Sequence, residues 1–254
     1  MLLCHVTPAI VLRTWPFGES DKIVSFLTES HGKLTGIAKG AKRSRKRFVN
    51  SLEPFSLVNL RFQDRTHSNL VFILAADLAF GFKDLLSSLE KISFASYLVE
   101  ITDGLIGERE ENYLVFRHLR DGLAQLERSI SLTFLTSFEL KLLKLTGYQP
   151  LLDSCRRCSK QRWDQCETRW HFSPRDGGIL CESCSRLRKE AFSLSTATLE
   201  ILTHLQKEKA VPASDVSTPT KVLKEIRSVI VRFIEFHMER EVKSATFLRQ
   251  LFLS

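Results

Sequence analysis

Four cysteines in two pairs are the feature that most constrains this chain. The pairs are Cys155-Arg-Arg-Cys158 and Cys181-Glu-Ser-Cys184, with twenty-two residues between them. Two residues between cysteines let both thiolates of a tight turn face one ion, and two such turns give a tetrahedral set of sulfur ligands. Gly177-Gly178 precedes the second pair and is expected to supply the backbone freedom that such a turn needs. The pattern predicts one structural zinc ion on these four cysteines.

Two other uses of the cysteines stay open, a redox dithiol and four unbound thiols. The distance between the pairs slightly exceeds the usual window of about fifteen to twenty residues. No secretory signal is recognisable at the start of the chain, so we expect a reducing, cytoplasmic setting in which metal binding is favoured over disulfides. Cys166 and His171 lie between the pairs without ligand spacing and are expected to be ordinary loop residues. Cys4 is expected in the core.

A closed set of four thiolates argues against catalysis at the metal. A catalytic zinc keeps one open position and usually takes His or carboxylate ligands. The sequence also lacks a phosphate-binding loop, a nucleophile elbow, a His-Glu-x-x-His motif and the zinc-deaminase pattern. We therefore expect a protein that is not an enzyme.

Positive charge is concentrated near the amino terminus. Residues 1–80 hold eleven Lys and Arg against six Asp and Glu, whereas residues 81–254 hold twenty-six against twenty-three. Six of the cations fall within nine residues, which we call the basic run: Lys39, Lys42, Arg43, Arg45, Lys46 and Arg47. Such a cluster neutralises phosphates, so it predicts sequence-independent nucleic-acid binding. A solvated surface loop is the alternative.

Aromatic side chains near the basic run are candidates for stacking on bases, as barrel proteins do with single strands. The available ones are Trp15, Phe17, Phe48 and Phe62. Phe62 is also expected in the core, because it alternates with polar neighbours in its strand.

The first eighty residues are predicted to form short strands. Strand-like stretches separated by turn signals are Ala9–Arg13, Ile23–Thr28, Lys33–Ala38, Phe55–Phe62 and Leu70–Ala75. Five short strands in this length favour a small closed barrel, of which the OB-fold is the five-stranded case. The spacing alone also allows an SH3-like barrel.

From about residue 81 the apolar period becomes helical. Stripes run through Leu135, Phe138, Leu142 and Leu145, and later through Val222, Ile226, Val229, Phe233 and Phe236. Further helices are predicted at 84–104, 112–127 and 196–208, with breaks at Gly104, Gly107 and Pro212. The sequence thus predicts an α+β chain: a small five-stranded barrel domain at 1–80, of the OB-fold or SH3-like kind, and an all-helical domain at 81–254. A loop-rich zinc segment is inserted at about 150–190. No apolar run is long enough to span a membrane.

The order of these features resembles the RecO family of bacterial DNA repair and recombination mediators. The likeness spans essentially the whole chain and depends on several short stretches in combination. They are Ala9–Arg13 with Gly18–Val24, Thr28–Leu34, Ala38–Lys42, Glu53–Leu57, Phe138–Leu143, Gly147–Pro150 and Lys243–Leu248.

The resemblance implies an amino-terminal OB-fold, a helical domain with a zinc-finger segment, and binding of single- and double-stranded DNA with annealing of complementary strands. It also implies partnership with RecR and with the carboxyl-terminal tail of single-strand-binding protein, and a role in loading RecA. Some family members lack the cysteines, and this chain has all four. The alternative is a scaffold, in which the barrel and the zinc segment bind only proteins.

Overall fold

The computed structural model describes residues 3–66, 68–162, 169–207 and 218–252. Contacts between residues divide the chain into two compact units, Met1–Arg128 and Ser129–Ser254. Cys166 and the predicted break at Pro212 lie outside the described residues.

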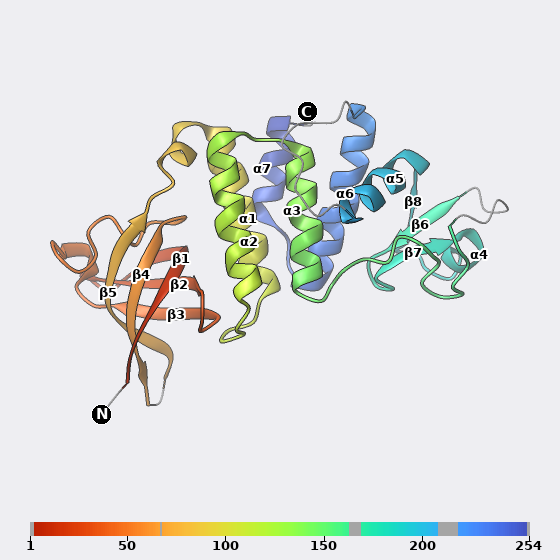
Figure 1. The fold of residues 1–254 in the computed structure, drawn as a ribbon. Helices are drawn as coiled ribbons and strands as arrows, with labels where there is room; N and C mark the ends of the chain where they lie inside the picture. The colour runs from red at the N-terminus through yellow and green to blue at the C-terminus, as the bar shows by residue number, and fades with distance from the viewer. Residues whose placement is uncertain (1–2, 67, 163–168, 208–217, 253–254) are drawn as a thin grey trace. The chain divides into compact units, whose positions relative to one another are not determined.

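The first unit begins with a closed barrel of five strands in the order β1-β2-β3-β5-β4 (Figure 1). All neighbours are antiparallel except β3 and β5, which pair in parallel at Gly36 with Val71 and at Ile37 with Phe72. The strands are β1 Cys4–Phe17, β2 Asp21–Thr28, β3 Lys33–Ala38, β4 Leu57–Arg65 and β5 Ser68–Phe80. The prediction of a five-stranded OB-fold barrel is confirmed.

Alternation along β4 fills the barrel core. Val58, Leu60 and Phe62 are fully buried, while Asn59 and Arg61 between them are exposed. This confirms the core assignment of Phe62.

Several strand ends differ from the prediction, and β2 and β5 are longer than expected. β1 is longer than expected because one half pairs with β4 and the other with β2, across a bulge between Val11 and Arg13. Phe55 has a φ of 71° and lies in the turn before β4, so that strand begins only at Leu57. Cys4 is exposed at the start of β1, so its expected place in the core was wrong.

Two helices complete the first unit. They are α1 Leu89–Leu105 and α2 Tyr113–Arg128, preceded by the short 3-10 helix η2 Lys83–Ser87. α1 contacts β1, and α2 contacts β2. The Asp103 carboxylate of α1 lies 2.9 Å from the Arg13 guanidinium and 3.5 Å from the Lys33 ammonium. The Arg109 N–H also donates to the Lys33 carbonyl at 2.9 Å. The boundary predicted at residue 80 therefore separates barrel from helices inside one compact unit.

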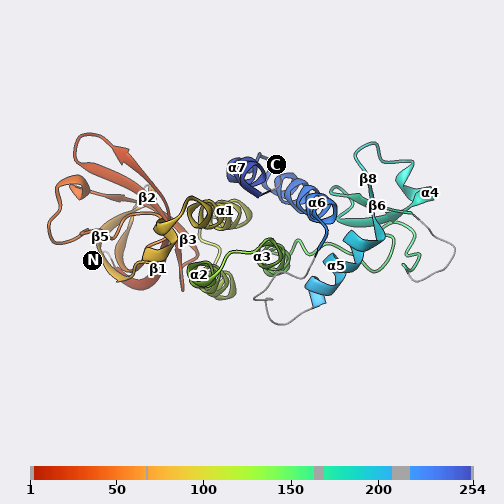
Figure 2. The ribbon, with the colours of Figure 1, turned by 90° about the horizontal axis from the view of Figure 1, so that it is seen from above.

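The second unit is built on three helices that pack against one another (Figure 2). They are α3 Leu132–Leu145, α5 Thr196–Lys207 and α6 Thr220–Met238, and α7 Lys243–Phe252 follows. Most of the predicted apolar stripes are buried, but Phe236 at the end of α6 is 46% exposed. Glu139 of α3 forms a buried ion pair with Arg227 of α6. The helix α7 was not predicted.

The segment predicted to be loop-rich contains a small antiparallel sheet in the order β7-β6-β8. The strands are β6 Trp170–Ser173, β7 Gly178–Cys181 and β8 Phe192–Leu194, and one helical turn, α4 Glu182–Ser185, follows β7. Strands of three or four residues are too short to give a recognisable period. Within the described residues, no helix is long and apolar enough to cross a membrane.

Candidate metal centre and nucleic-acid interface

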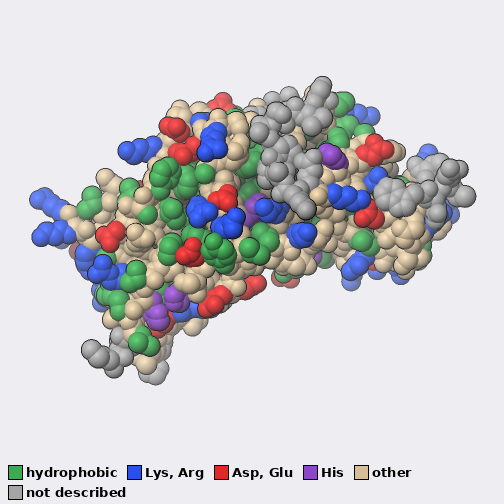
Figure 3. Space-filling view, viewed as in Figure 1, with side chains coloured by type: hydrophobic (Ala, Val, Ile, Leu, Met, Phe, Trp, Pro, Cys, Tyr) green, Lys and Arg blue, Asp and Glu red, His purple; other side chains and the backbone are tan. Residues whose placement is uncertain are grey.

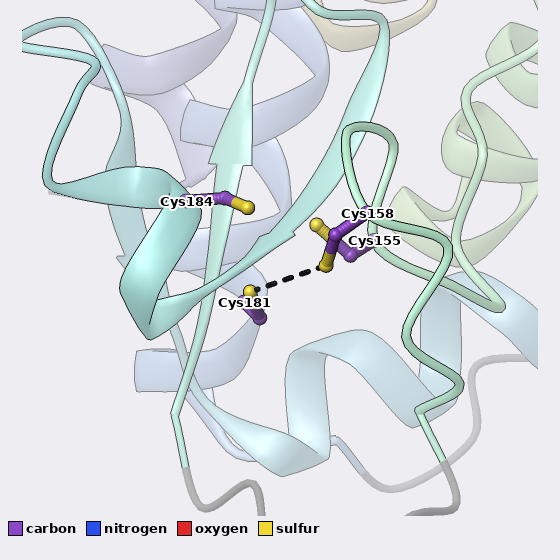
Figure 4. Close-up of side chains that lie close together, drawn as sticks. All are labelled: Cys155, Cys158, Cys181 and Cys184. Carbon is purple, nitrogen blue, oxygen red and sulfur yellow. Dashed lines mark hydrogen bonds between the residues drawn. The ribbon is translucent and has the colours of Figure 1, made fainter.

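The four cysteines of the two pairs converge on one point (Figure 4). Their sulfur atoms all lie within 4.8 Å of one another, and Sγ of Cys158 is 3.7 Å from Sγ of Cys181. Bonds of about 2.3 Å to a tetrahedral zinc ion would place sulfur atoms about 3.8 Å apart. The spacing therefore fits a four-sulfur metal site, and among the described residues this is the cluster that offers one.

The first pair lies in a tight turn between α3 and β6. The turn closes with a hydrogen bond from the Ser159 N–H to the Cys155 carbonyl at 2.9 Å. The backbone N–H groups of Arg157 and Cys158 donate to Sγ of Cys155. The two residues between the cysteines therefore set the separation of the two sulfur atoms and also direct backbone N–H groups toward Sγ of Cys155. That sulfur becomes negatively charged when it binds a metal.

The second pair joins the end of β7 to α4. Cys181 is the last residue of the strand and is buried, while Cys184 lies one helical turn on and is half-buried. The Cys184 N–H donates to Sγ of Cys181, which repeats the arrangement of the first turn.

The thiols differ in acidity because backbone N–H groups surround the sulfur of Cys155, whereas other thiols surround that of Cys184. Burial raises the pKa of Cys155, but the N–H groups of Cys181, Cys158 and Arg157 outweigh it and lower that pKa to about 7. Burial and the neighbouring thiols of Cys181, Cys158 and Cys155 raise the pKa of Cys184 to about 12. One thiolate forms readily, and a full set requires a cation to share its charge.

The glycine pair has a different role from the one predicted. Gly177, with a φ of 75°, ends the turn between β6 and β7, and Gly178 is the first residue of β7, so neither belongs to a cysteine turn. A Cβ on Gly178 would lie 2.4 Å from the Leu151 carbonyl oxygen. Leu151 lies shortly before the first cysteine turn, and Gly178 begins the strand that ends at Cys181. Their close approach therefore brings the two cysteine pairs together.

Asp176 braces the same hairpin. Its carboxylate accepts bonds from the Arg188 guanidinium at 2.9 and 3.1 Å and from the Ser173 hydroxyl at 2.6 Å. Burial raises the pKa of Asp176, but these donors outweigh it and leave the pKa below its ordinary value. Arg188 follows α4, so its ion pair with Asp176 holds the chain after the second cysteine turn against the β6–β7 hairpin. This ion pair was not predicted, because no periodicity in the sequence links its two members.

His171 lies in β6, opposite Leu180 of β7 and Ser193 of β8, and is not part of the four-sulfur cluster. It is a strand residue, although a loop position was expected.

The basic run lies in the first half of the connection between β3 and β4, and all six of its cations are exposed. It contains the short 3-10 helix η1 Ala41–Arg43. Figure 3 shows Lys and Arg side chains gathered at the left-hand end, over the barrel. The run is held by a few fixed points, since Ala41 and Phe48 are buried in the barrel core.

Backbone contacts fix both ends of the run. At its start, the Gly40 N–H donates to the Asp21 carboxylate at 2.8 Å, and the Lys42 N–H donates to the Ser20 carbonyl at 2.9 Å. The Gly40 bond is the main reason why the pKa of Asp21 lies below its ordinary value. At its end, the Ala76 N–H of β5 donates to the Arg47 carbonyl at 3.0 Å.

The Asp21 carboxylate lies near the charges of the run, since Lys39 and Lys42 help to lower its pKa, but it is not ion-paired with them. In the described part of the chain, no carboxylate forms an ion pair with any of the six cations. Four other barrel cations do have acidic partners: Arg13, Lys22, Lys33 and Arg61. The uncompensated positive charge of the barrel therefore lies mainly on the run.

The structure divides the four candidate aromatics into two pairs. Phe48 and Phe62 are 5% and 0% exposed and belong to the core, so neither has a ring face free for a base. Trp15 and Phe17 are 39% and 49% exposed at the end of β1.

Comparison with known proteins gives two family matches that together cover most of the chain. Residues 1–82 match the family described as recombination protein O, N terminal. Residues 86–246 match recombination protein O, C terminal.

Curated relatives are similar along nearly their whole length. A DNA repair protein RecO from Caldanaerobacter subterraneus subsp. tengcongensis is 34% identical over 249 residues, which is 96% of this chain and 97% of that protein. The protein of the same name from Syntrophus aciditrophicus is 32% identical over 250 residues, covering 97% and 96%. That from Myxococcus xanthus is 32% identical over 244 residues, covering 96% of each.

Proposed function

This chain belongs to the RecO family of DNA repair proteins, and on that premise we propose that it is a recombination mediator. It binds single- and double-stranded DNA, anneals complementary strands and, with RecR, helps to load RecA onto DNA coated by single-strand-binding protein. The carboxyl-terminal tail of that binding protein is its second protein partner. It acts in the cytoplasm, at the nucleoid.

The observation that carries the DNA-binding proposal is the set of six exposed cations without carboxylate partners on the barrel. An ion-paired cation must give up its partner before it contacts a phosphate, whereas these six need not. Their contacts with phosphates would release counterions and give affinity without sequence preference. A mediator requires that property, because base pairing between the strands supplies the sequence information.

Annealing follows from the same charges. Two strands repel each other through their phosphates, and a cationic surface that holds both lowers that barrier without making or breaking bonds. We therefore propose that the protein works without catalytic residues.

For the metal centre we propose one structural zinc ion bound by Cys155, Cys158, Cys181 and Cys184. Four thiolates complete a tetrahedral set and leave no position for a substrate. The ion would hold the cysteine segment, residues 150–190, in shape. Metal analysis of protein purified under reducing conditions should give one zinc per chain, and its absence would refute this assignment.

The test of DNA binding compares the protein with a variant in which Lys42, Arg43, Arg45, Lys46 and Arg47 are all changed to Ala. Affinity for a fluorescent single strand is measured over a range of salt concentrations. Affinity falls with salt, and each lost phosphate contact should make the slope of log affinity against log salt less steep by about 0.7 for single strands. Annealing of complementary strands is then measured with and without RecR and single-strand-binding protein.

A matched control removes five exposed cations from elsewhere: Lys83, Arg128, Lys141, Lys144 and Lys189. The control should retain most of the affinity and the salt slope. If both variants bind DNA as the parent does, the run is not the DNA site. If the parent protein itself does not bind at physiological salt, the scaffold function is correct.

A further inference from the structure

Two exposed aromatic rings lie next to each other at the tip of the β1–β2 hairpin. Trp15 and Phe17 are 39% and 49% exposed. They are two residues apart in β1 and therefore project from the same face of the strand. We call them the hairpin aromatics.

That face is the outside of the barrel. Trp15 lies opposite Ile23, Ile23 lies opposite Ile37, and Ile37 lies opposite Phe72. Directly paired residues share a face of the sheet, so these four form one row across β1, β2, β3 and β5.

The neighbours of this row confirm its direction. Val24 follows Ile23, Ala38 follows Ile37, and Ile73 follows Phe72, and all three belong to the barrel core. Because successive side chains in a strand point to opposite faces, the row from Trp15 to Phe72 points outward.

The basic run contacts one end of this outward row and the backbone of the hairpin tip beyond the other end. Near the hairpin aromatics, the Lys42 ammonium donates to the Gly18 carbonyl at 2.8 Å. At the other end, the Lys39 ammonium lies 5.9 Å from the centre of the Phe72 ring. Exposed rings and unpaired cations are thus adjacent parts of one surface.

We propose that Trp15 and Phe17 stack on unpaired bases of a single strand whose phosphates lie along the basic run. The proposal rests on the DNA binding proposed above and adds the residues that select single strands. Every base has a ring face, so stacking on an aromatic side chain tolerates any sequence. In a duplex those faces are already covered by neighbouring bases.

The two parts of the surface respond differently to salt and to the form of the DNA. Cations on phosphates contribute to single and double strands alike, and their contribution falls with salt. Rings on bases contribute only to single strands, and stacking releases no counterions. The two contributions can therefore be measured separately.

The experiment measures affinity for a single strand and for a duplex of the same sequence, with the full-length protein. Changing Trp15 and Phe17 together to Ala should weaken single-strand binding about ten-fold or more, in line with the known cost of losing base stacking. Duplex affinity and the salt slope should stay at the parent values. Phe80→Ala, which removes a 50% exposed ring at the end of β5, is the matched control and should change neither affinity.

A second measurement does not depend on the double variant folding. Trp15→Phe keeps a stacking ring and should keep single-strand affinity, but it should remove the quenching of tryptophan emission that single strands cause in the parent. The other tryptophans are Trp163 and Trp170, and Trp170 is buried.

The outcomes separate the two proposals. Equal loss on single strand and duplex, or unchanged single-strand affinity with quenching retained in Trp15→Phe, would overturn stacking and assign the hairpin aromatics to a protein contact. If the basic-run variant also leaves both affinities unchanged, DNA binding by this surface is itself wrong.

Discussion

In the cysteine segment, four side chains converge until their sulfur atoms are within 4.8 Å, whereas in the basic run six cations are exposed and unpaired. With the proposed metal ion bound, the first region would gain stability from a ligand that joins its parts. The second has charges that contribute little to folding, because exposed charges interact weakly in water. In this molecule, the structural requirement and the proposed binding function therefore fall on different residues.

This contrast predicts that Cys181→Ser has the largest effect on stability. Loss of one thiolate should release the ion and destabilise the second unit by several kcal/mol, because metal-binding energy is folding energy in such sites. Metal content and thermal unfolding measure both consequences. Cys4→Ser, at an exposed thiol outside the cluster, should leave both unchanged.

DNA affinity of the Cys181→Ser protein, measured below its unfolding temperature, tests the separation of roles. An affinity equal to that of the parent supports it. A large loss would mean that the cysteine segment contributes to the DNA surface.

The next largest effect is expected at the anchor of the basic run. Phe48 is 5% exposed within the barrel core, so Phe48→Ala should cost about 3–5 kcal/mol of stability. Chemical denaturation of the full-length protein would measure this. Lys46→Ala, two residues away and exposed, should change stability by no more than about 0.5 kcal/mol. Similar costs for the two variants would contradict the division between anchor and charges.

A smaller effect is expected at Gly178. An added methyl group would meet the backbone oxygen of Leu151 at 2.4 Å, so Gly178→Ala should destabilise the second unit by about 1–3 kcal/mol. Zinc affinity, measured by competition with a chelator, should fall with it. Gly81→Ala is the control, since its new Cβ would meet only a leucine side chain at 3.7 Å. Unchanged zinc affinity would show that the close approach does not position the cysteines.

The smallest effect concerns acid stability at Asp176. Because its pKa is lowered in the folded protein, its contribution is present above the ordinary Asp value of about 3.9 and is lost as pH falls below it. Asp176→Asn should cost about 1–2 kcal/mol at pH 7, through weaker bonds to Arg188. The difference from the parent should shrink toward pH 3. Unfolding free energies across this range measure it, and a constant difference would exclude the ionised carboxylate as the cause.

Those parts of the fold and of the candidate sites that depend on a local pattern could be predicted from the sequence. The alternation of Val58, Leu60 and Phe62 identified a half-buried strand, and the spacing of the cysteines identified their common target. The basic run was visible as composition. The strand alternation, the basic run and each cysteine pair taken by itself are contained within a few residues, and elementary geometry converts them into structure.

The sequence was less informative wherever partners lie far apart along the chain. Asp176 forms an ion pair with Arg188, twelve residues later, and Asp103 forms one with Lys33, seventy residues earlier. No period in the sequence links the members of either pair. The strands β6 and β7 were missed because each has only four residues. Trp170 and Phe172 on either side of His171 did give a faint alternating signal, ahead of a turn with Pro174 and two glycines.

The contacts of Lys33 have a practical consequence for anyone who wishes to isolate the barrel. Its ammonium and its carbonyl are bound by Asp103 and Arg109, so a fragment that stops at residue 80 would lose both partners at once. It would also uncover the parts of β1 and β2 that α1 and α2 contact. The smallest piece of this protein suited to separate expression therefore ends at Arg128, with both helices retained.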